Sequence, residues 1–129
     1  MDSRDVLKQI LPVIEVEELN SLPIETFQTK TLRPILKFQN ALILSVFNTF
    51  LIEYKVDFIN LSKEKKKLKI SEILKENLQV KQFYLGIIVA FFTQEELTLY
   101  FENKKEINKR IIALLIERIS SQIGDINQV

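Results

Sequence analysis

Two of the side chains most used in catalysis are absent from this sequence, which has no cysteine and no histidine. Their absence removes thiol nucleophiles, disulfides and thiolate zinc sites, together with the general base that titrates near neutral pH. Any catalysis would fall to carboxylates, lysine, tyrosine or serine. The sequence also has no phosphate loop, dinucleotide fingerprint, serine elbow or histidine metal motif.

The carboxylates follow no catalytic or metal-binding pattern. Those closest together in the sequence are Glu15, Glu17 and Glu18, and then Glu95, Glu96, Glu102 and Glu106. Di-metal sites in helical bundles combine glutamate with Glu-x-x-His motifs, and this chain has no histidine to complete one. We therefore expect a protein that is not an enzyme and that holds no cofactor and no metal. No catalytic residue is assigned.

Four polar residues are candidates for ligand contacts: Arg33, Gln39, Tyr100 and Arg118. The interiors of helical bundles hold pockets for small molecules, and these side chains would suit an anionic or amphipathic ligand. For Arg33, the favoured alternative is an ion pair with a carboxylate of a neighbouring helix. Gln39 falls on the apolar stripe of its predicted helix, where an unpaired buried amide costs about 1–3 kcal/mol. An interhelical hydrogen bond is therefore the favoured alternative for Gln39.

A run of lysines, KEKKKLK, occupies residues 63–69 and is a candidate anion patch. Its members are Lys63, Lys65, Lys66, Lys67 and Lys69. They point in several directions around a predicted helix and sit at the positive end of its dipole, so a solubilising role is favoured. The chain has 18 basic and 17 acidic residues, so its net charge is too small to attract a polyanion such as a nucleic acid. No aromatic residue interleaves with the lysines to stack on bases. Nucleic-acid binding is the least favoured function.

The composition predicts one all-α domain that covers residues 1–129. Apolar residues make up 47% and charged residues 27% of the chain, which is typical of a globular protein, and two glycines with three prolines are too few for a sandwich or barrel. A chain of this length supports one core. We expect a compact bundle of five or six helices. Residues 1–22 should hold a short helix from Asp2 to Ile10 and then a crossing segment.

The bundle should be built around residues 78–92, which contain FYLGIIVAFF. Ten residues without a charge, apolar on every side, are typical of a buried central helix and are too few to cross a bilayer. Asn77 would cap this helix. Gly86 and Ala90 would form a groove of small residues in which another helix packs closely.

Helix-start signals organise the sequence before this central helix. One helix should occupy residues 31–54, with Pro34 in its first turn. A second should occupy residues 63–76, with Ser62 as its cap and Leu68 among its buried residues.

Two capping boxes should divide the sequence after the central helix. The first joins Thr93 to Glu96, and the second joins Asn103 to Glu106 and starts a last helix that ends at Gly124. The apolar residues on one side of this last helix are Ile107, Ile111, Leu114, Leu115, Ile119 and Ile123.

Ile112 and Ile116 widen the apolar arc of the last helix, so this helix is either central or covered by another subunit. Three helices have apolar faces wider than one core of this size can bury, and surplus apolar surface is typical of interfaces. The favoured function is a non-catalytic protein-interaction module that associates with itself, with Ile112 and Ile116 at the interface. The alternative is a bundle that binds a small anionic or amphipathic molecule. The sequence shows no secretory signal and no membrane span, so the cytoplasm is the expected location.

The runs FQTKTLRPILKFQN, FFTQEE and NKRIIALLIER resemble a group of small, uncharacterised helical bacterial proteins, some of which carry the label glyoxalase. The likeness covers most of the chain, from about Pro23 to Ile123. These residues specify helix caps and core faces more than chemistry. The glyoxalase fold itself is built from βαβββ units that place histidine and glutamate on a metal, and this sequence departs from it in both respects. The resemblance implies an all-helical fold and transfers no catalytic residue.

Overall fold

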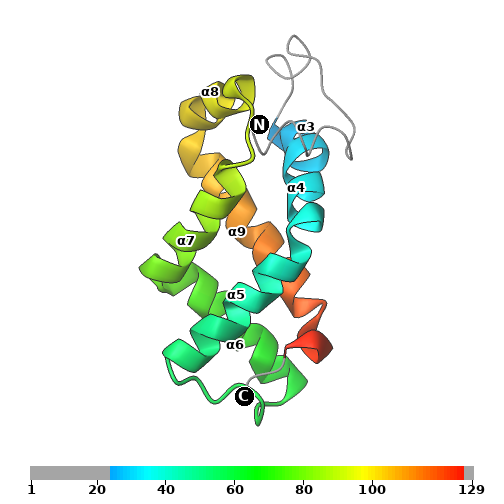
Figure 1. The fold of residues 1–129 in the computed structure, drawn as a ribbon, viewed down its shortest axis with the longest axis vertical. Coiled ribbons are helices and arrows are strands. Elements are labelled where there is room, and N and C mark those ends of the chain that lie inside the picture. Colours follow the sequence, from blue (N-terminus) through cyan, green and yellow to red (C-terminus); the bar gives the residue numbers. More distant parts are fainter. Residues whose placement is uncertain (1–23, 127–129) are drawn as a thin grey trace.

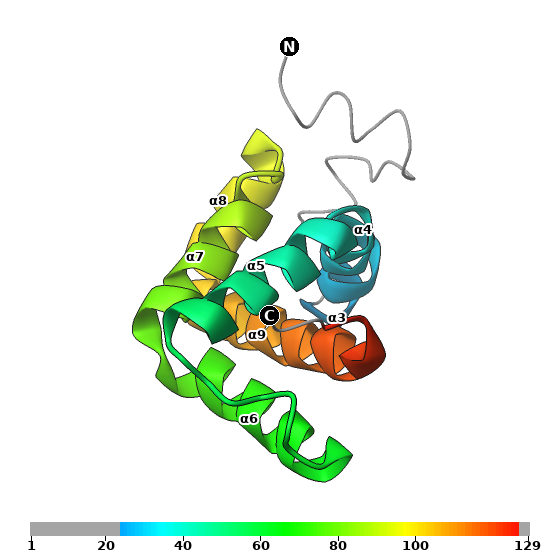
Figure 2. The same cartoon turned by 60° about the horizontal axis from the view of Figure 1, so that its bottom comes forward.

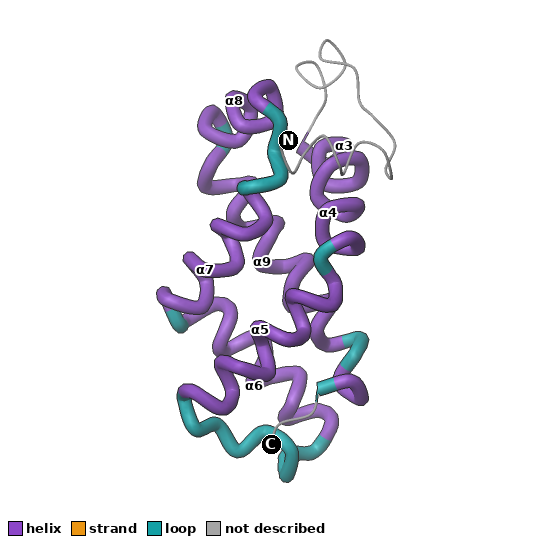
Figure 3. The backbone as a smooth tube through the Cα atoms, viewed as in Figure 1, coloured by secondary structure: helices purple, strands orange, loops and turns teal. Residues whose placement is uncertain are grey.

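A computed structural model of the chain describes residues 24–126, and all the regular structure in that range is helical. The predicted all-α class is therefore confirmed. The elements are α3 (Ile24–Phe27), η1 (Gln28–Leu32), α4 (Arg33–Phe38), α5 (Asn40–Glu53), α6 (Lys63–Glu76), α7 (Leu78–Val89), α8 (Gln94–Glu102), α9 (Lys104–Ser120) and η2 (Ile123–Asp125) (Figures 1 and 3). The helix and crossing segment predicted within residues 1–22 lie outside the described residues.

The helix at the centre of the fold is α9. It lies between α7 and α4 in Figure 1, and α5 crosses over it in Figure 2. Its buried side chains are Ile107, Ile111, Ile112, Leu114, Leu115 and Ile119. The helix is amphipathic with a broad apolar arc, which suits a position where several helices pack around it.

The prediction that residues 78–92 are buried on every side is wrong. Only one face of α7 is buried, and it consists of Val80, Tyr84 and Ile88 at intervals of four residues. Phe83, on another face, is 48% exposed. The expected close packing at Gly86 is also wrong, because a Cβ atom built on it would meet nothing within 4 Å.

The chain is already helical before Thr31, so the predicted helix start there is wrong. η1 is a π-helical turn in which the backbone N–H of Arg33 donates to the carbonyl of Gln28. This wider turn comes directly before Pro34, which has no N–H for the regular pattern. Phe27, at the end of α3, is fully buried.

The predicted helix over residues 31–54 is two helices. α4 ends at Phe38 and α5 begins at Asn40, and the segment Ile24–Phe38 is bent by 67° relative to α5. Gln39 lies at the break with φ −92° and ψ 11°, outside helical geometry. Within residues 24–126, no single helix is long and apolar enough to cross a membrane, and this bent pair passes that test only when its two parts are combined.

Two predicted caps, Ser62 and Asn77, are confirmed. The backbone N–H of Lys65 donates to Ser62 Oγ at 3.3 Å, and that of Val80 donates to Asn77 Oδ1 at 3.2 Å. α6 begins and ends at the predicted residues. Leu68, however, lies on the outer side of α6 and is 69% exposed, so its predicted burial is wrong.

The predicted capping box at Thr93 is also confirmed. The N–H of Glu96 donates to Thr93 Oγ1 at 3.2 Å, and the N–H of Thr93 donates to Glu96 Oε1 at 2.8 Å. Glu96 is only 2% exposed, and its Oε2 accepts a hydrogen bond of 3.1 Å from Thr31 Oγ1. One carboxylate therefore caps α8 and ties it to η1, which is 65 residues away in the sequence.

The second predicted capping box is wrong. Asn103 is the single residue between α8 and α9, and its backbone N–H and its side-chain Nδ2 both donate to the carbonyl of Leu99. Its side chain is thus engaged at the end of α8, and Glu106 pairs with Arg110 at 3.0 Å. α9 ends at Ser120, before the predicted stop at Gly124.

We expect Thr93→Ala to lower the free energy of unfolding by about 1 kcal/mol, because it removes the cap of α8. Urea denaturation followed by circular dichroism measures the change. Thr98→Ala is the matched control, since Thr98 lies on the exposed side of the same helix. Equal stability of the two variants would contradict the role assigned to the capping box.

Candidate functional site

Arg33 and Arg118, two of the predicted ligand contacts, lie close together between α4 and the end of α9. Both line a small cleft of about 180 Å³. Arg33 Nη1 lies 3.6 Å from Glu117 Oε1, and both side chains are largely exposed. The structure thus gives Arg33 the ion pair with a neighbouring helix that the sequence favoured. Exposed pairs of this kind contribute about 0–1 kcal/mol.

The polar groups in this corner of the fold bind one another. Asn40 Nδ2 donates to Gln122 Oε1 at 2.7 Å, and Gln122 Nε2 donates to Asn40 Oδ1 at 2.8 Å. Arg118 Nη1 donates to the same Asn40 oxygen at 3.2 Å. Asn40 begins α5 directly after the break at Gln39, so this cluster fastens the start of α5 to the end of α9. Asn40 and Gln122 were missed by sequence reasoning, because no local pattern connects residues so far apart.

Tyr100 belongs to α8 and lies beside the first turns of α9, whereas Arg33 and Arg118 lie near the end of α9. Its hydroxyl donates to Asn108 Oδ1 at 2.6 Å, and its ring packs edge-on against Phe92 with centroids 5.7 Å apart. Burial raises the pKa of the Tyr100 hydroxyl above its ordinary value. Ten residues of helix, or about 15 Å, separate Asn108 from Arg118. The four predicted contacts therefore do not line one pocket.

The lysine run is divided among several contacts. Lys66 lies 5.6 Å from the centroid of the Phe58 ring, and Lys69 lies 3.5 Å from Glu72. Lys63, Lys66 and Lys67 line a cleft of about 370 Å³ together with Ser120 and Ser121 at the end of α9. The negative end of the α9 dipole thus faces the lysines that crowd the positive end of α6. Lys65 is exposed.

The predicted interface residues on α9 belong to the core of the chain. Ile112 is only 7% exposed, and Ile116 is partly buried against the same core. α9 is therefore central, which was one of the two alternatives for this helix, and an interface between two copies of the chain would have to use apolar side chains elsewhere.

Exposed apolar side chains gather along α5 and α7, which lie near one another in Figure 2. At one end of the two helices, Phe38 contacts Phe91 with ring centroids 5.8 Å apart, and at the other Phe50 contacts Phe83 at 5.6 Å. Leu42 lies between these contacts on α5 and is 44% exposed, and Phe38 is 39% exposed. We call this surface the outer face, and its residues are Phe38, Leu42, Val46, Phe50, Phe83, Gly86, Ile87, Ala90 and Phe91.

The outer face carries no charge. Residues 38–52 and residues 82–94 contain no aspartate, glutamate, lysine or arginine. In the whole chain 27% of residues are charged, so two uncharged stretches of this length on one surface are a strong local depletion. Depletion of charge combined with aromatic side chains is typical of the core of protein interfaces.

Gly86 and Ala90 are the small residues of the outer face. Both are exposed, and open space lies where a Cβ atom of Gly86 would be. The sequence predicted that another helix packs closely on these two small residues, and no helix does so within residues 24–126. A helix from outside could approach the backbone of α7 closely at this point.

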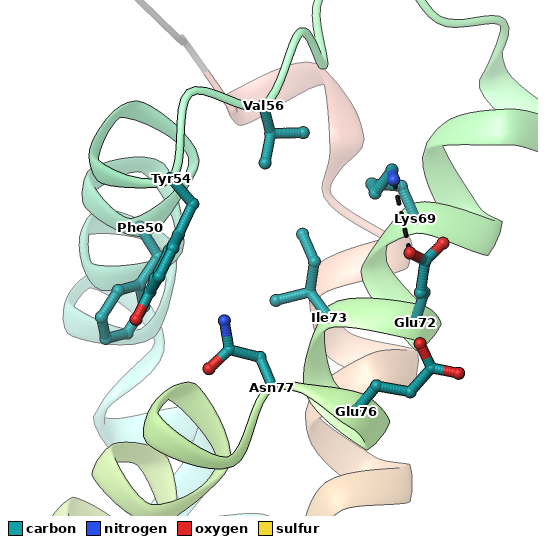
Figure 4. A pocket seen from close by; sticks show the side chains of 8 residues that line it. All are labelled: Phe50, Tyr54, Val56, Lys69, Glu72, Ile73, Glu76 and Asn77. Atoms are coloured by element: carbon teal, nitrogen blue, oxygen red, sulfur yellow. Dashed lines mark ion pairs between the residues drawn. The ribbon is translucent and has the colours of Figure 1, made fainter.

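A cleft of about 340 Å³ lies beside the outer face, at the C-terminal end of α5 (Figure 4). Phe50 and Tyr54 form one side of it, and Glu72 and Glu76 of α6 lie on the other. The remaining lining residues are Val56, Lys69, Ile73 and Asn77. Because Phe50 belongs both to the outer face and to this cleft, a partner seated on the face could place one of its side chains in the cleft.

Tyr84 fixes the rotation of α7 that produces the outer face. Its side chain is fully buried, and its hydroxyl donates to the carbonyl of Ile43 on α5 at 2.8 Å. Its ring also lies 6.3 Å from that of Phe50. With Tyr84 directed inward, Phe83 and Gly86 must lie on the sides of α7 that face away from the core.

Within residues 24–126, no group of three acidic side chains forms a potential metal site. Comparison with protein-family models, with curated proteins and with solved structures gives no match for this chain. The resemblance to small helical bacterial proteins therefore stays a prediction.

We expect stability to fall as the pH rises above about 10, because burial raises the pKa of Tyr84 above its ordinary value of 10.0. Above that pH the folded state keeps the proton that the unfolded chain has lost, so the unfolding free energy decreases with pH. Tyr84→Phe should cost about 1 kcal/mol near neutral pH and show a smaller loss between about pH 9 and 11. Urea titrations at each pH measure both, and an unchanged alkaline slope in the variant would contradict the assignment.

Proposed function

We propose that the protein is a non-catalytic interaction module that binds protein through the outer face of α5 and α7, and that it associates with itself. The observation that carries the proposal is the uncharged surface with the exposed side chains of Phe38, Leu42 and Phe83. Removing apolar area from water stabilises an association by about 25 cal/mol per Å², before the costs of binding. A partner that covers these side chains gains this free energy of apolar burial without burying a charge.

The absence of charge favours a second copy as the partner. In a two-fold dimer the same surface meets itself, so a patch of one sign would repel its own copy. The outer face has no such repulsion, because residues 38–52 and 82–94 are uncharged. The open surface at Gly86 and Ala90 would let α7 of each copy approach α7 of the other.

We expect the double variant Leu42→Glu, Phe83→Glu to be a folded monomer under conditions in which the wild type associates. Each glutamate would place an unpaired charge in the interface, at a cost of several kcal/mol. Both positions are substantially exposed in the single chain, so the fold should survive. Sedimentation velocity measures the mass, and circular dichroism confirms the helical content.

The matched control is Leu68→Glu, Phe101→Glu, which makes the same chemical change at two exposed positions away from the outer face. This control should associate like the wild type. A wild type that stays monomeric at millimolar concentration, or a control that dissociates as readily as the outer-face variant, would contradict the proposal.

A further inference from the structure

A groove rimmed by lysines lies between α6, α7 and α9, separate from the outer face. Its volume is about 590 Å³. Lys75 of α6 and Lys81 of α7 supply two of its charges, and Lys105 and Lys109 of α9 supply the other two. The remaining lining residues are Leu85, Asn108, Ile112 and Ala113. We call it the lysine groove.

The four lysines are not neutralised by the part of the chain that the structure describes. Ion pairs in residues 24–126 involve Lys69, Arg33 and Arg110, and none involves a lysine of the groove. No acidic residue lines the groove. Four positive charges around one concave surface produce a local positive field, although the whole chain has a net charge of only +1.

Asn108 is the fifth side chain of the groove that can donate a hydrogen bond, after the four lysines. Its Oδ1 accepts the hydrogen bond from the Tyr100 hydroxyl at 2.6 Å, and this contact fixes the orientation of the amide. The Nδ2 group makes no hydrogen bond within residues 24–126 and can donate to a ligand. The polar side chains of the groove therefore offer donors, which is the arrangement that suits carboxylates.

The rest of the lining is apolar. Ile112 is almost fully buried, Leu85 is partly buried, and Ala113 is small and exposed. The aliphatic stems of the lysines extend this apolar surface, because long cationic side chains keep only the ammonium group in water. A ligand that fits must therefore be apolar along its centre and negatively charged along its edges.

We propose that the lysine groove binds an acidic amphipathic α-helix of a partner protein. The apolar stripe of such a helix would cover Leu85, Ile112 and Ala113, and glutamates on either side of the stripe would pair with the lysines of α7 and α9. Complementary charges of this kind set the orientation of the bound helix and speed its association. A fatty acid has one carboxylate for four lysines, and a nucleic acid has no apolar stripe, so both fit the groove less well.

The test uses the full-length protein and a fluorescein-labelled peptide of about 18 residues, made of leucine, alanine and glutamate with one apolar stripe. Fluorescence anisotropy should show binding that weakens as the salt concentration rises from about 50 to about 300 mM. The variant Lys81→Glu, Lys109→Glu should weaken binding by about tenfold or more. Ala113→Glu, which changes the floor and leaves every lysine in place, should also weaken it.

Two controls separate the groove from general electrostatics. Lys65→Glu, Lys67→Glu makes the same change in net charge outside the groove and should bind within about twofold of the wild type. A peptide of identical composition in scrambled order should bind at least about tenfold more weakly than the amphipathic one. The proposal is overturned if the scrambled peptide binds equally well, if both double variants lose binding to the same extent, or if a uridine oligonucleotide displaces the peptide from the groove.

Discussion

The arrangement of the two surfaces depends on the burial of one polar group, the hydroxyl of Tyr84. A buried hydroxyl without a partner costs about 1–3 kcal/mol, and the carbonyl of Ile43 supplies the acceptor. This bond joins α7 to α5 at a fixed rotation of α7. The rotation directs Val80, Tyr84 and Ile88 into the core, and the same rotation turns Phe83 away from it.

The apolar character of α7 thus has two separate consequences. One face completes the core around α9, and the other remains uncovered within residues 24–126, because no further helix packs on it. On the remaining side of α7, Lys81 and Leu85 contribute to the lysine groove. A single helix therefore contributes to the core, to the uncharged outer face and to the positively charged groove, and two partners of different chemistry could bind without competing for the same side chains.

Three of the four predicted helix caps follow from the sequence alone, and the long-range contacts of the fold do not. The caps at Ser62, Asn77 and Thr93 depend on residues within one helical turn, so the adjacent residues in the sequence are enough to predict them. The break at Gln39 has no glycine or proline beside it. The contacts around it come from side chains distant in the sequence, among them Gln122, and these favour two helices over one.

The functional surfaces were predictable only in part. The sequence indicated an excess of apolar surface, but it placed the interface on Ile112, because periodicity cannot say which of several apolar helices is central. The lysine groove draws one charge each from α6 and α7 and two from α9, and these are separated by up to 34 positions between Lys75 and Lys109. The lysine run at residues 63–69 is easier to see in the sequence. Three of its lysines nevertheless lie beside the end of α9, and Lys69 pairs with Glu72.

The measurement that tests the central claim most directly is the concentration dependence of the amide signals of α7 in a ¹⁵N–¹H NMR spectrum of the wild-type protein. Between about 10 µM and about 1 mM, a range that spans weak self-association, the signals of Phe83, Gly86 and Ala90 should shift or broaden together. The signal of Leu68, on the exposed side of α6, should stay constant. Constant signals along α7, or changes confined to another surface, would contradict the assignment of the outer face as the interface.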